Sequence, residues 1–157
     1  MLSISLLGLF AGLIQEGMIT GLRTVSATNT REQVRAQLAG ALERFTREAG
    51  LCNDVDNAQD ERFQFDADLD GDGSDENNIN YVYSSGTLTR SQDGTTVTLL
   101  SGITAFDLDY LDSSGTSLAT PVAGASEDTI RVVEVTATAA NGAESISMAS
   151  AAYLRNM

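Results

Sequence analysis

The chain has 157 residues, with nine arginines, no lysine, no histidine and one cysteine against 22 acidic residues, and a net charge of −13. Without histidine or lysine, the sequence contains no Ser/His or Cys/His nucleophile pair, no imidazole zinc site, no P-loop and no Schiff-base lysine. The acidic balance repels nucleic acid and anionic membrane surfaces. Chemistry that uses carboxylates alone stays open, but with so many acidic residues no particular pair points to a hydrolase. We therefore expect neither an enzyme nor a nucleic-acid partner.

Residues 1–25 are predominantly apolar and begin with the run MLSISLLGLFAGLI. Those fourteen residues are shorter than the roughly 20 needed to span a bilayer. Three interpretations are open: a secretory signal peptide, a buried core helix, or the last part of a membrane helix. The segment also has two GxxxG spacings, which place small residues on one helix face for close packing, although four glycines can equally just weaken a helix. These residues are Gly8, Gly12, Gly17 and Gly21.

Residues 31–49 are predicted to form an amphipathic helix. Apolar residues recur there at steps of three and four, which makes one stripe along a helix, and most of the charged residues lie off it. The stripe consists of Val34, Leu38, Ala41, Leu42, Phe45 and Ala49. Glu48 is placed with the charged residues, off the stripe. If residues 2–49 were one helix, it would be on the order of 70 Å long.

After Gly50 the composition shifts to Gly, Asp, Ser, Thr and β-branched residues, and this part holds four arginines against 18 acidic residues. Segments of period two alternate with turn signals and predict a small antiparallel sheet, one face buried and the other wet. The natural cover for the buried face is the stripe of the helix. The predicted strands are Arg62–Asp66, Ile79–Tyr83, Thr87–Arg90, Thr95–Leu100, Ile103–Leu111, Thr129–Ala140 and Ser145–Leu154. Expected hairpin corners are Ser84-Ser85-Gly86, Ser113-Ser114-Gly115 and Asn141-Gly142.

An acidic run resembles the opening of a calcium loop. Asp66, Asp68, Asp70, Gly71 and Asp72 follow the DxDxDG pattern, in which alternate carboxylates converge on a hard cation. In that frame the twelfth position is Asn77 instead of a bidentate Glu, and a shift of two residues puts Ile79 there; Asp75 or Glu76 could substitute. The candidate calcium ligands are thus Asp66, Asp68, Asp70, Asp72, Asp75 and Glu76. The alternative is a soluble acidic turn without a metal.

Two further features are interpreted as structural. The segment Gly115 to Gly124 resembles the nucleophile segment of subtilisin-like proteases, with Ser117 as the attacking residue. A serine nucleophile needs a general base, which this chain lacks, so we interpret the segment as a surface loop between strands. Cys52 cannot form a disulfide within the chain, because it is the single cysteine, and we expect a buried thiol.

Several stretches together make the chain resemble type IV pilin-like proteins, specifically minor pilins or pseudopilins of the W or J type. The family's processing motif is absent, so we expect the given start to omit a leader and its cleavage site. The stretches are the N-terminal apolar run, Gly21-Leu22-Arg23, the acidic turn before Ile79-Asn80-Tyr81, Leu88-Thr89-Arg90, Ile103 to Leu111 with Asp112 and Gly115, Ile130 to Thr136, and Leu154-Arg155-Asn156.

The resemblance implies an α+β fold, in which a long N-terminal helix packs on a small antiparallel sheet. Residues 1–25 would be a hydrophobic helix of the membrane or filament core, residues 26–50 the amphipathic half of the same helix, and residues 51–157 an acidic β-rich domain. The implied function is a structural subunit of a type IV pilus or a type II secretion pseudopilus. It would be held in the inner membrane before assembly with copies of itself or other pilins into a periplasmic or extracellular filament. The alternative is a secreted calcium-binding β-rich module, whose first 27 residues are a cleaved signal peptide.

Overall fold

The computed structural model describes residues 31–141 and 144–154. A compact unit begins at Ala36, and the sheets and the sites below lie within it. The predicted helix at residues 1–25 and its four GxxxG glycines, Gly8, Gly12, Gly17 and Gly21, fall outside the described residues. The amphipathic helix is confirmed over residues 31–49 and ends in a turn at Gly50 and Leu51.

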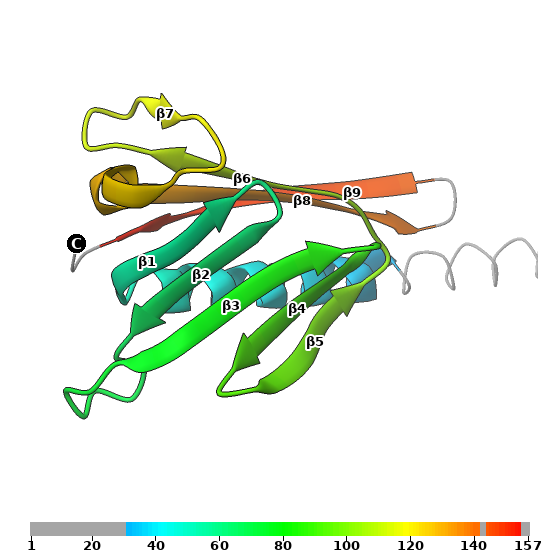
Figure 1. Cartoon of the computed structure of the whole chain (residues 1–157). Coiled ribbons are helices and arrows are strands. Elements are labelled where there is room, and N and C mark those ends of the chain that lie inside the picture. Colours follow the sequence, from blue (N-terminus) through cyan, green and yellow to red (C-terminus); the bar gives the residue numbers. More distant parts are fainter. Residues whose placement is uncertain (1–30, 142–143, 155–157) are drawn as a thin grey trace, which may run out of the picture. The chain divides into compact units, whose positions relative to one another are not determined.

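The strands form two antiparallel sheets. The five-stranded sheet has the order β1-β2-β3-β4-β5, and the four-stranded sheet has the order β7-β6-β8-β9. Figure 1 shows the helix behind the five-stranded sheet. The strands are β1 (Cys52–Gln59), β2 (Arg62–Ala67), β3 (Glu76–Ser84), β4 (Thr87–Gln92), β5 (Thr95–Ser101), β6 (Ile103–Leu111), β7 (Ser117–Leu118), β8 (Val132–Asn141) and β9 (Glu144–Tyr153), with a 3-10 helix η1 (Gly124–Thr129) before β8.

The predicted fold class is therefore wrong. The described part of the chain is mostly β, with one helix at residues 31–49, and it does not show the pilin-like α+β arrangement of a long N-terminal helix on a small sheet. The physical reason is the amount of apolar surface on the strands. The alternating pattern buries one face of each of the two sheets. The apolar stripe of the helix is about four turns long and cannot cover the buried faces of both sheets, so the sheets also pack against a shared core.

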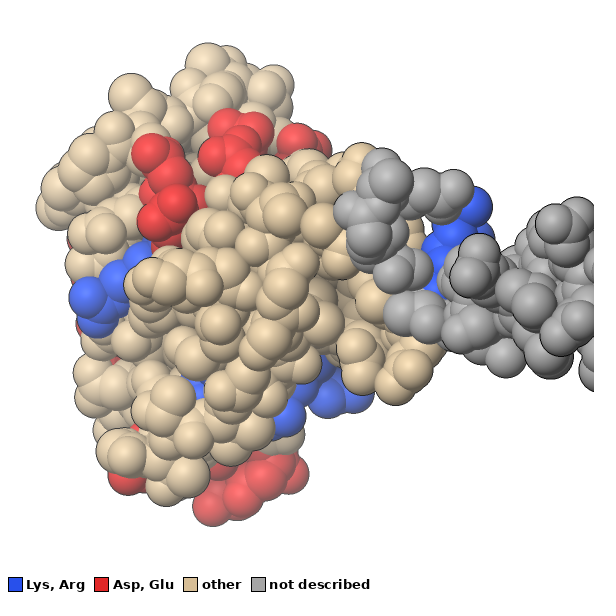
Figure 2. Space-filling view, turned by 90° about the vertical axis from the view of Figure 1, so that its right-hand side faces the viewer, with Lys and Arg blue, Asp and Glu red and all other residues tan. Residues whose placement is uncertain are grey.

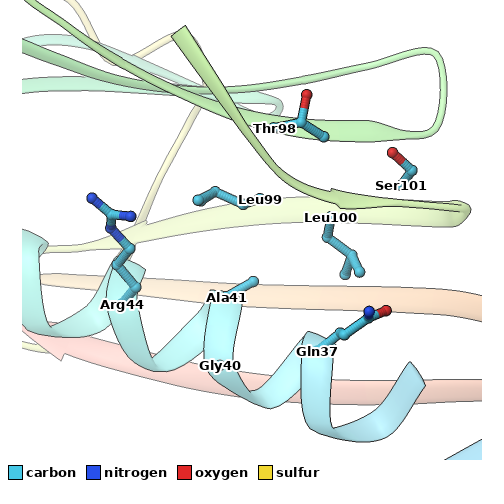
Figure 3. A pocket seen from close by; sticks show the side chains of 8 residues that line it. All are labelled: Gln37, Gly40, Ala41, Arg44, Thr98, Leu99, Leu100 and Ser101. Atoms are coloured by element: carbon cyan, nitrogen blue, oxygen red, sulfur yellow. The ribbon is translucent and has the colours of Figure 1, made fainter. Parts of the chain in front are cut away.

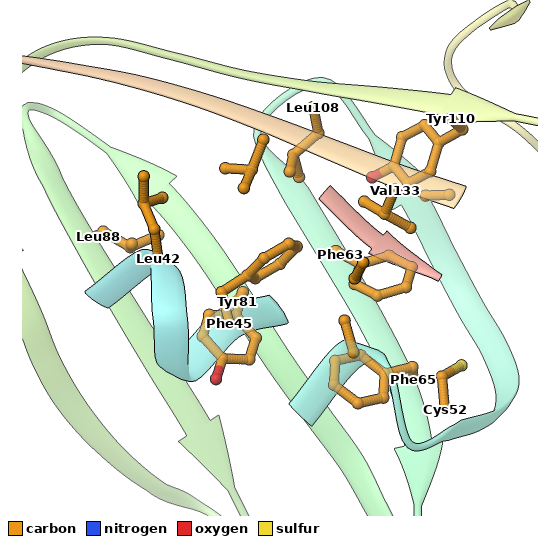
Figure 4. Packing of buried hydrophobic residues seen from close by; sticks show 14 of the residues in the cluster. Leu42, Phe45, Cys52, Phe63, Phe65, Tyr81, Leu88, Leu108, Tyr110 and Val133 are labelled. Carbon is orange, nitrogen blue, oxygen red and sulfur yellow. The ribbon is translucent and has the colours of Figure 1, made fainter. Parts of the chain in front are cut away.

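Aromatic rings in the core connect the helix, the five-stranded sheet and the four-stranded sheet (Figure 4). Phe45 of the helix meets Tyr81 of β3 edge to face, with ring centroids 5.0 Å apart. Phe63 of β2 lies 6.0 Å from Phe45 and 5.8 Å from Tyr110 of β6, so it bridges the helix and the second sheet. These rings are fully buried, and loss of one typically costs about 3–5 kcal/mol.

The hairpin corners show why particular turn residues are needed. Ser85 and Gly86 join β3 to β4 with φ of 50° and 78°, which is the geometry of a two-residue type I′ turn. A Cβ atom added at Gly86 would lie 3.1 Å from the Ile103 carbonyl oxygen, which is closer than an ordinary contact. Gly115 has φ of 79° in the corner between β6 and β7. Gly142 of the third predicted corner, Asn141-Gly142, is outside the described residues, although β8 and β9 pair up to Asn141 and Glu144.

Candidate metal centre and helix anchor

The acidic loop between β2 and β3 is held together by its own carboxylates. Asp68 accepts hydrogen bonds from the amides of Gly71 and Gly73, at 2.7 and 3.0 Å. Asp70 accepts from the amide of Asp72 at 3.1 Å, and Asp72 from that of Ser74 at 2.8 Å. Short acidic side chains make such local bonds readily, and both glycines have positive φ, so the loop turns tightly without steric cost.

Three of the six candidate ligands come together. Single carboxylate oxygens of Asp68, Asp70 and Asp72 lie within 4.8 Å of one another. Carboxylate oxygens are the ligands that Ca²⁺ prefers, and the three like charges repel one another without a cation. Asp70 and Asp72 are exposed and Asp68 is half-buried, so the cluster is open to solvent.

The other three candidate ligands have separate partners at the ends of the loop. Asp66 accepts the amide of Asn78 at 2.7 Å, and Glu76 accepts the amide of Leu69 at 2.6 Å. Asp75 accepts a hydrogen bond from the side chain of Asn53 on β1. The convergent aspartates thus belong to a frame that starts at Asp68, two residues later than the one predicted.

In the frame from Asp68, Gly73 takes the sixth position, where calcium loops have their turn glycine. The twelfth position is Ile79, which is fully buried in β3 and has no oxygen ligand on its side chain. Glu76 takes the ninth position, and its carboxylate already accepts a hydrogen bond from the amide of Leu69. The loop therefore offers the first half of a calcium loop, and its remaining ligands would be backbone carbonyls or water.

A second polar cluster joins the helix to the five-stranded sheet. Glu48 accepts hydrogen bonds from Arg90 Nε of β4 at 2.6 Å and from the Tyr81 hydroxyl of β3 at 2.8 Å. Its other oxygen accepts from Arg44 Nε, one helical turn earlier, at 2.8 Å. Glu48 and Arg90 are 6% and 7% exposed, so this is a buried ion pair between the helix and the sheet. We call these four residues the helix anchor.

The charges of the anchor set the pKa of Glu48. Burial alone would raise the pKa of this carboxyl group, but the hydrogen bonds from Arg90, Arg44 and Tyr81 outweigh burial and lower it below its ordinary value. Burial and the neighbouring carboxylate raise the pKa of the Tyr81 hydroxyl. Glu48 therefore stays ionised at neutral pH, while Tyr81 stays protonated and donates.

The placement of Glu48 off the apolar stripe was wrong. It is the single buried acidic residue of the described part of the chain. Its position gave a usable signal: Glu48 is three residues after Phe45 and seven after Ala41, both of which are on the stripe, so helical periodicity puts it on the inward face. Its partner Arg90 comes two residues after the buried Leu88 on β4, so the two side chains share the inward face of the strand.

Of the two features interpreted as structural, the buried thiol is confirmed and the surface loop only in part. Within Gly115 to Gly124, residues Ser117 and Leu118 form the strand β7, and Val122 is buried and forms a bridge with Ala58 of β1. Ser117 is exposed on the two-residue strand β7, where it pairs with Leu111 of β6. Cys52 is fully buried at the start of β1, and burial raises the pKa of its thiol to about 12. Because the thiolate is the reactive form, this thiol is unreactive near neutral pH.

Within the described residues, no helix is both long enough and apolar enough to span a membrane. The predicted inner-membrane segment, residues 1–25, lies outside them. Comparison with models of known protein families and with curated proteins found no match. Together with the mostly β fold, this overturns the resemblance to type IV pilin-like proteins.

Proposed function

We propose that the chain is a non-enzymatic structural subunit that assembles with other copies through its N-terminal segment. The proposal rests on the apolar composition of residues 1–25, since an apolar segment of this length is an aggregation hazard unless lipid or other chains cover it. The filament class expected from the sequence, a type IV pilus or a type II secretion pseudopilus, stays a prediction.

The observation that supports a structural role is the way the helix is fixed in the β-rich unit. Leu38, Phe45 and Ala49 are fully buried along its inner face. Near its end the anchor adds a buried ion pair to β4 and a hydrogen bond to β3. A helix whose inner face is buried from Leu38 to Ala49 is part of the packed unit and does not act as a loose linker, as an assembling subunit requires.

The test compares the full-length protein with a variant that lacks residues 1–25. The full-length protein should sediment as an assembly, or need detergent to stay in solution, whereas the variant should be monomeric. Electron microscopy of the sedimented material shows whether it is filamentous. A full-length protein that is monomeric and soluble without detergent would contradict the proposal.

A second candidate function is calcium binding, which the convergence of Asp68, Asp70 and Asp72 favours. It belongs either to the assembling subunit or to the alternative of a secreted calcium-binding module. Mass spectrometry of the mature N-terminus separates these two: a chain processed near residue 27 supports the secreted module. Isothermal titration with Ca²⁺, repeated with Asp68→Ala, tests the binding itself, and equal heats for both proteins would exclude this site.

A further inference from the structure

A groove runs between the helix and the edge strand β5 (Figure 3). It has a volume of about 490 Å³, within the usual size range of binding clefts. Gln37, Gly40, Ala41 and Arg44 line it from the helix, and Thr98, Leu99, Leu100 and Ser101 line it from β5. Since β5 is the last strand of its sheet, its outer backbone groups have no strand partner among the described residues. The groove therefore offers backbone hydrogen-bonding groups beside small and apolar side chains.

The groove carries positive charge in an acidic protein. Arg44 is its single charged lining residue, and 39% of that side chain is exposed. In the anchor, Arg44 and Arg90 share the one carboxylate of Glu48, so the cluster keeps one uncompensated positive charge. Arg44 is the exposed member, and Figure 3 shows its guanidinium group at one end of the groove. An acidic ligand is therefore favoured here.

The chain itself provides a protruding acidic segment. Residues 66–76 contain six acidic side chains, and the tip from Asp70 to Gly73 is exposed. The tip has no bulky side chain, and its two glycines allow a backbone to approach closely. Figure 2 shows acidic side chains gathered in separate patches on the face that it presents. The loop is the densest run of acidic residues in the chain.

The loop and the end of β5, whose residues line the groove, lie at opposite ends of the five-stranded sheet (Figure 1). The loop directly precedes Glu76, at the start of β3. Thr87, which follows the hairpin at the other end of β3, pairs with Ser101 in the groove wall. The loop therefore cannot enter the groove of its own chain, which leaves the groove of a second copy as its counterpart.

We infer that the groove between the helix and β5 binds the aspartate loop, residues 68–74, of a second copy of this chain. The contact places the loop carboxylates near Arg44 and the loop backbone beside the free edge of β5. It joins two different surfaces of the chain, so repeated contacts extend head to tail instead of closing on a two-fold axis. The inference rests on the proposed assembly of copies and names the surfaces through which the β-rich units touch.

The experiment uses site-specific disulfide formation between full-length variants. Ser74→Cys in the loop and Ser101→Cys in the groove are both exposed positions. The two single variants are mixed under mild oxidation, and the cross-linked peptides are identified by mass spectrometry. The buried thiol of Cys52 does not compete. Ala149→Cys, exposed on β9, is mixed with Ser74→Cys as the matched control. The loop–groove cross-link should exceed the control cross-link on the order of tenfold, because a specific contact raises the effective concentration of the thiols.

A plug in the groove provides a variant that should fold well. Gly40 is helical, and a Cβ added there meets no atom within 4 Å. Gly40→Leu fills the groove and improves helix propensity by up to about 1 kcal/mol, so loss of the cross-link cannot come from unfolding. In the Ser101→Cys background it should lower the cross-link to the control level. Arg44→Gln should lower it several-fold, and about 1 M salt should do the same to the unplugged protein.

Sedimentation of the same samples separates the two proposals. Sedimenting protein with the loop–groove cross-link at the control level would overturn the inference and leave the proposed assembly standing. Protein that neither sediments nor cross-links would overturn both. A cross-link that persists in Gly40→Leu would also overturn the inference, because the groove would then not be the site of contact.

Discussion

Glu48 in the helix anchor and Asp68 in the loop between β2 and β3 are both carboxylates that accept several hydrogen bonds, but their surroundings differ. Glu48 is buried and has two arginines and a tyrosine hydroxyl as donors. Asp68 is half-buried, accepts hydrogen bonds from two backbone amides, and has Asp70 and Asp72 as neighbours. The anchor therefore has an excess of positive charge and the loop an excess of negative charge. Because its charge is matched by buried donors, Glu48 stabilises the fold, whereas the unmatched carboxylates of the loop are available to a ligand.

The largest effect is expected from breaking the anchor. Glu48→Ala leaves Arg90 buried without its carboxylate, and removal of one partner of a buried ion pair typically costs about 3–5 kcal/mol. Urea denaturation should show this loss in the free energy of unfolding. Glu43→Ala, an exposed position one turn earlier, is the matched control and should change stability by no more than about 0.5 kcal/mol. Equal losses in both variants would contradict a special role for Glu48.

The same carboxylate predicts how stability depends on pH. The pKa of Glu48 is lower in the folded than in the unfolded protein, so its contribution is fully present above its unfolded pKa. The contribution is lost as the pH falls through the folded pKa, because the unfolded state then binds more protons. Stability measured across this acidic range should fall less steeply for Glu48→Gln than for the wild type. Parallel curves would show that Glu48 is not stabilised in the fold.

Because the loop has an excess of negative charge, we predict that an added cation stabilises the folded protein. If Ca²⁺ binds only to the folded protein, a free concentration 100 times the dissociation constant raises the free energy of unfolding by about 2.7 kcal/mol. Asp68→Ala should remove this increase. The control Asp93→Asn, in the turn between β4 and β5, should retain it. Thermal unfolding with and without Ca²⁺ measures the effect, and an identical response of both variants would argue against the Asp68 cluster.

The smallest effect is expected at Arg44, because it is the anchor residue that is partly open to solvent, as the loop is. Arg44 is partly exposed and pairs with Glu48 four residues later on the same helix. Such pairs contribute about 0.3–0.5 kcal/mol, and Arg90 still pairs with Glu48 when Arg44 is removed. Arg44→Ala should thus change stability by less than about 1 kcal/mol in urea denaturation. A loss as large as that of Glu48→Ala would mean that Arg44 is part of the buried pair and not a surface charge.

The hydrophobic periodicity of each segment was enough to predict most of the helices and strands of this protein. The helix at residues 31–49 and all seven predicted strands are present, because most of them have a clear helical or alternating period. The strand β1 was missed for a physical reason. It is rich in Asp and Asn, and its two bulges bury Cys52, Val55 and Ala58 at every third residue, so no alternation is visible. The short strand β7 has too few residues to form a period.

What the amino-acid sequence by itself determined was thus the type and approximate range of each periodic element, and the presence of an acidic loop. Only the tertiary structure decided that the strands divide into two sheets, that Asp68, Asp70 and Asp72 converge while Asp66 does not, and that Glu48 lies inside. The reason is that periodicity reports one face of one segment, whereas sheet partition, ligand convergence and ion pairing depend on residues far apart in the chain. Glu48 and Arg90 are separated by 42 positions, and no local pattern records that they meet.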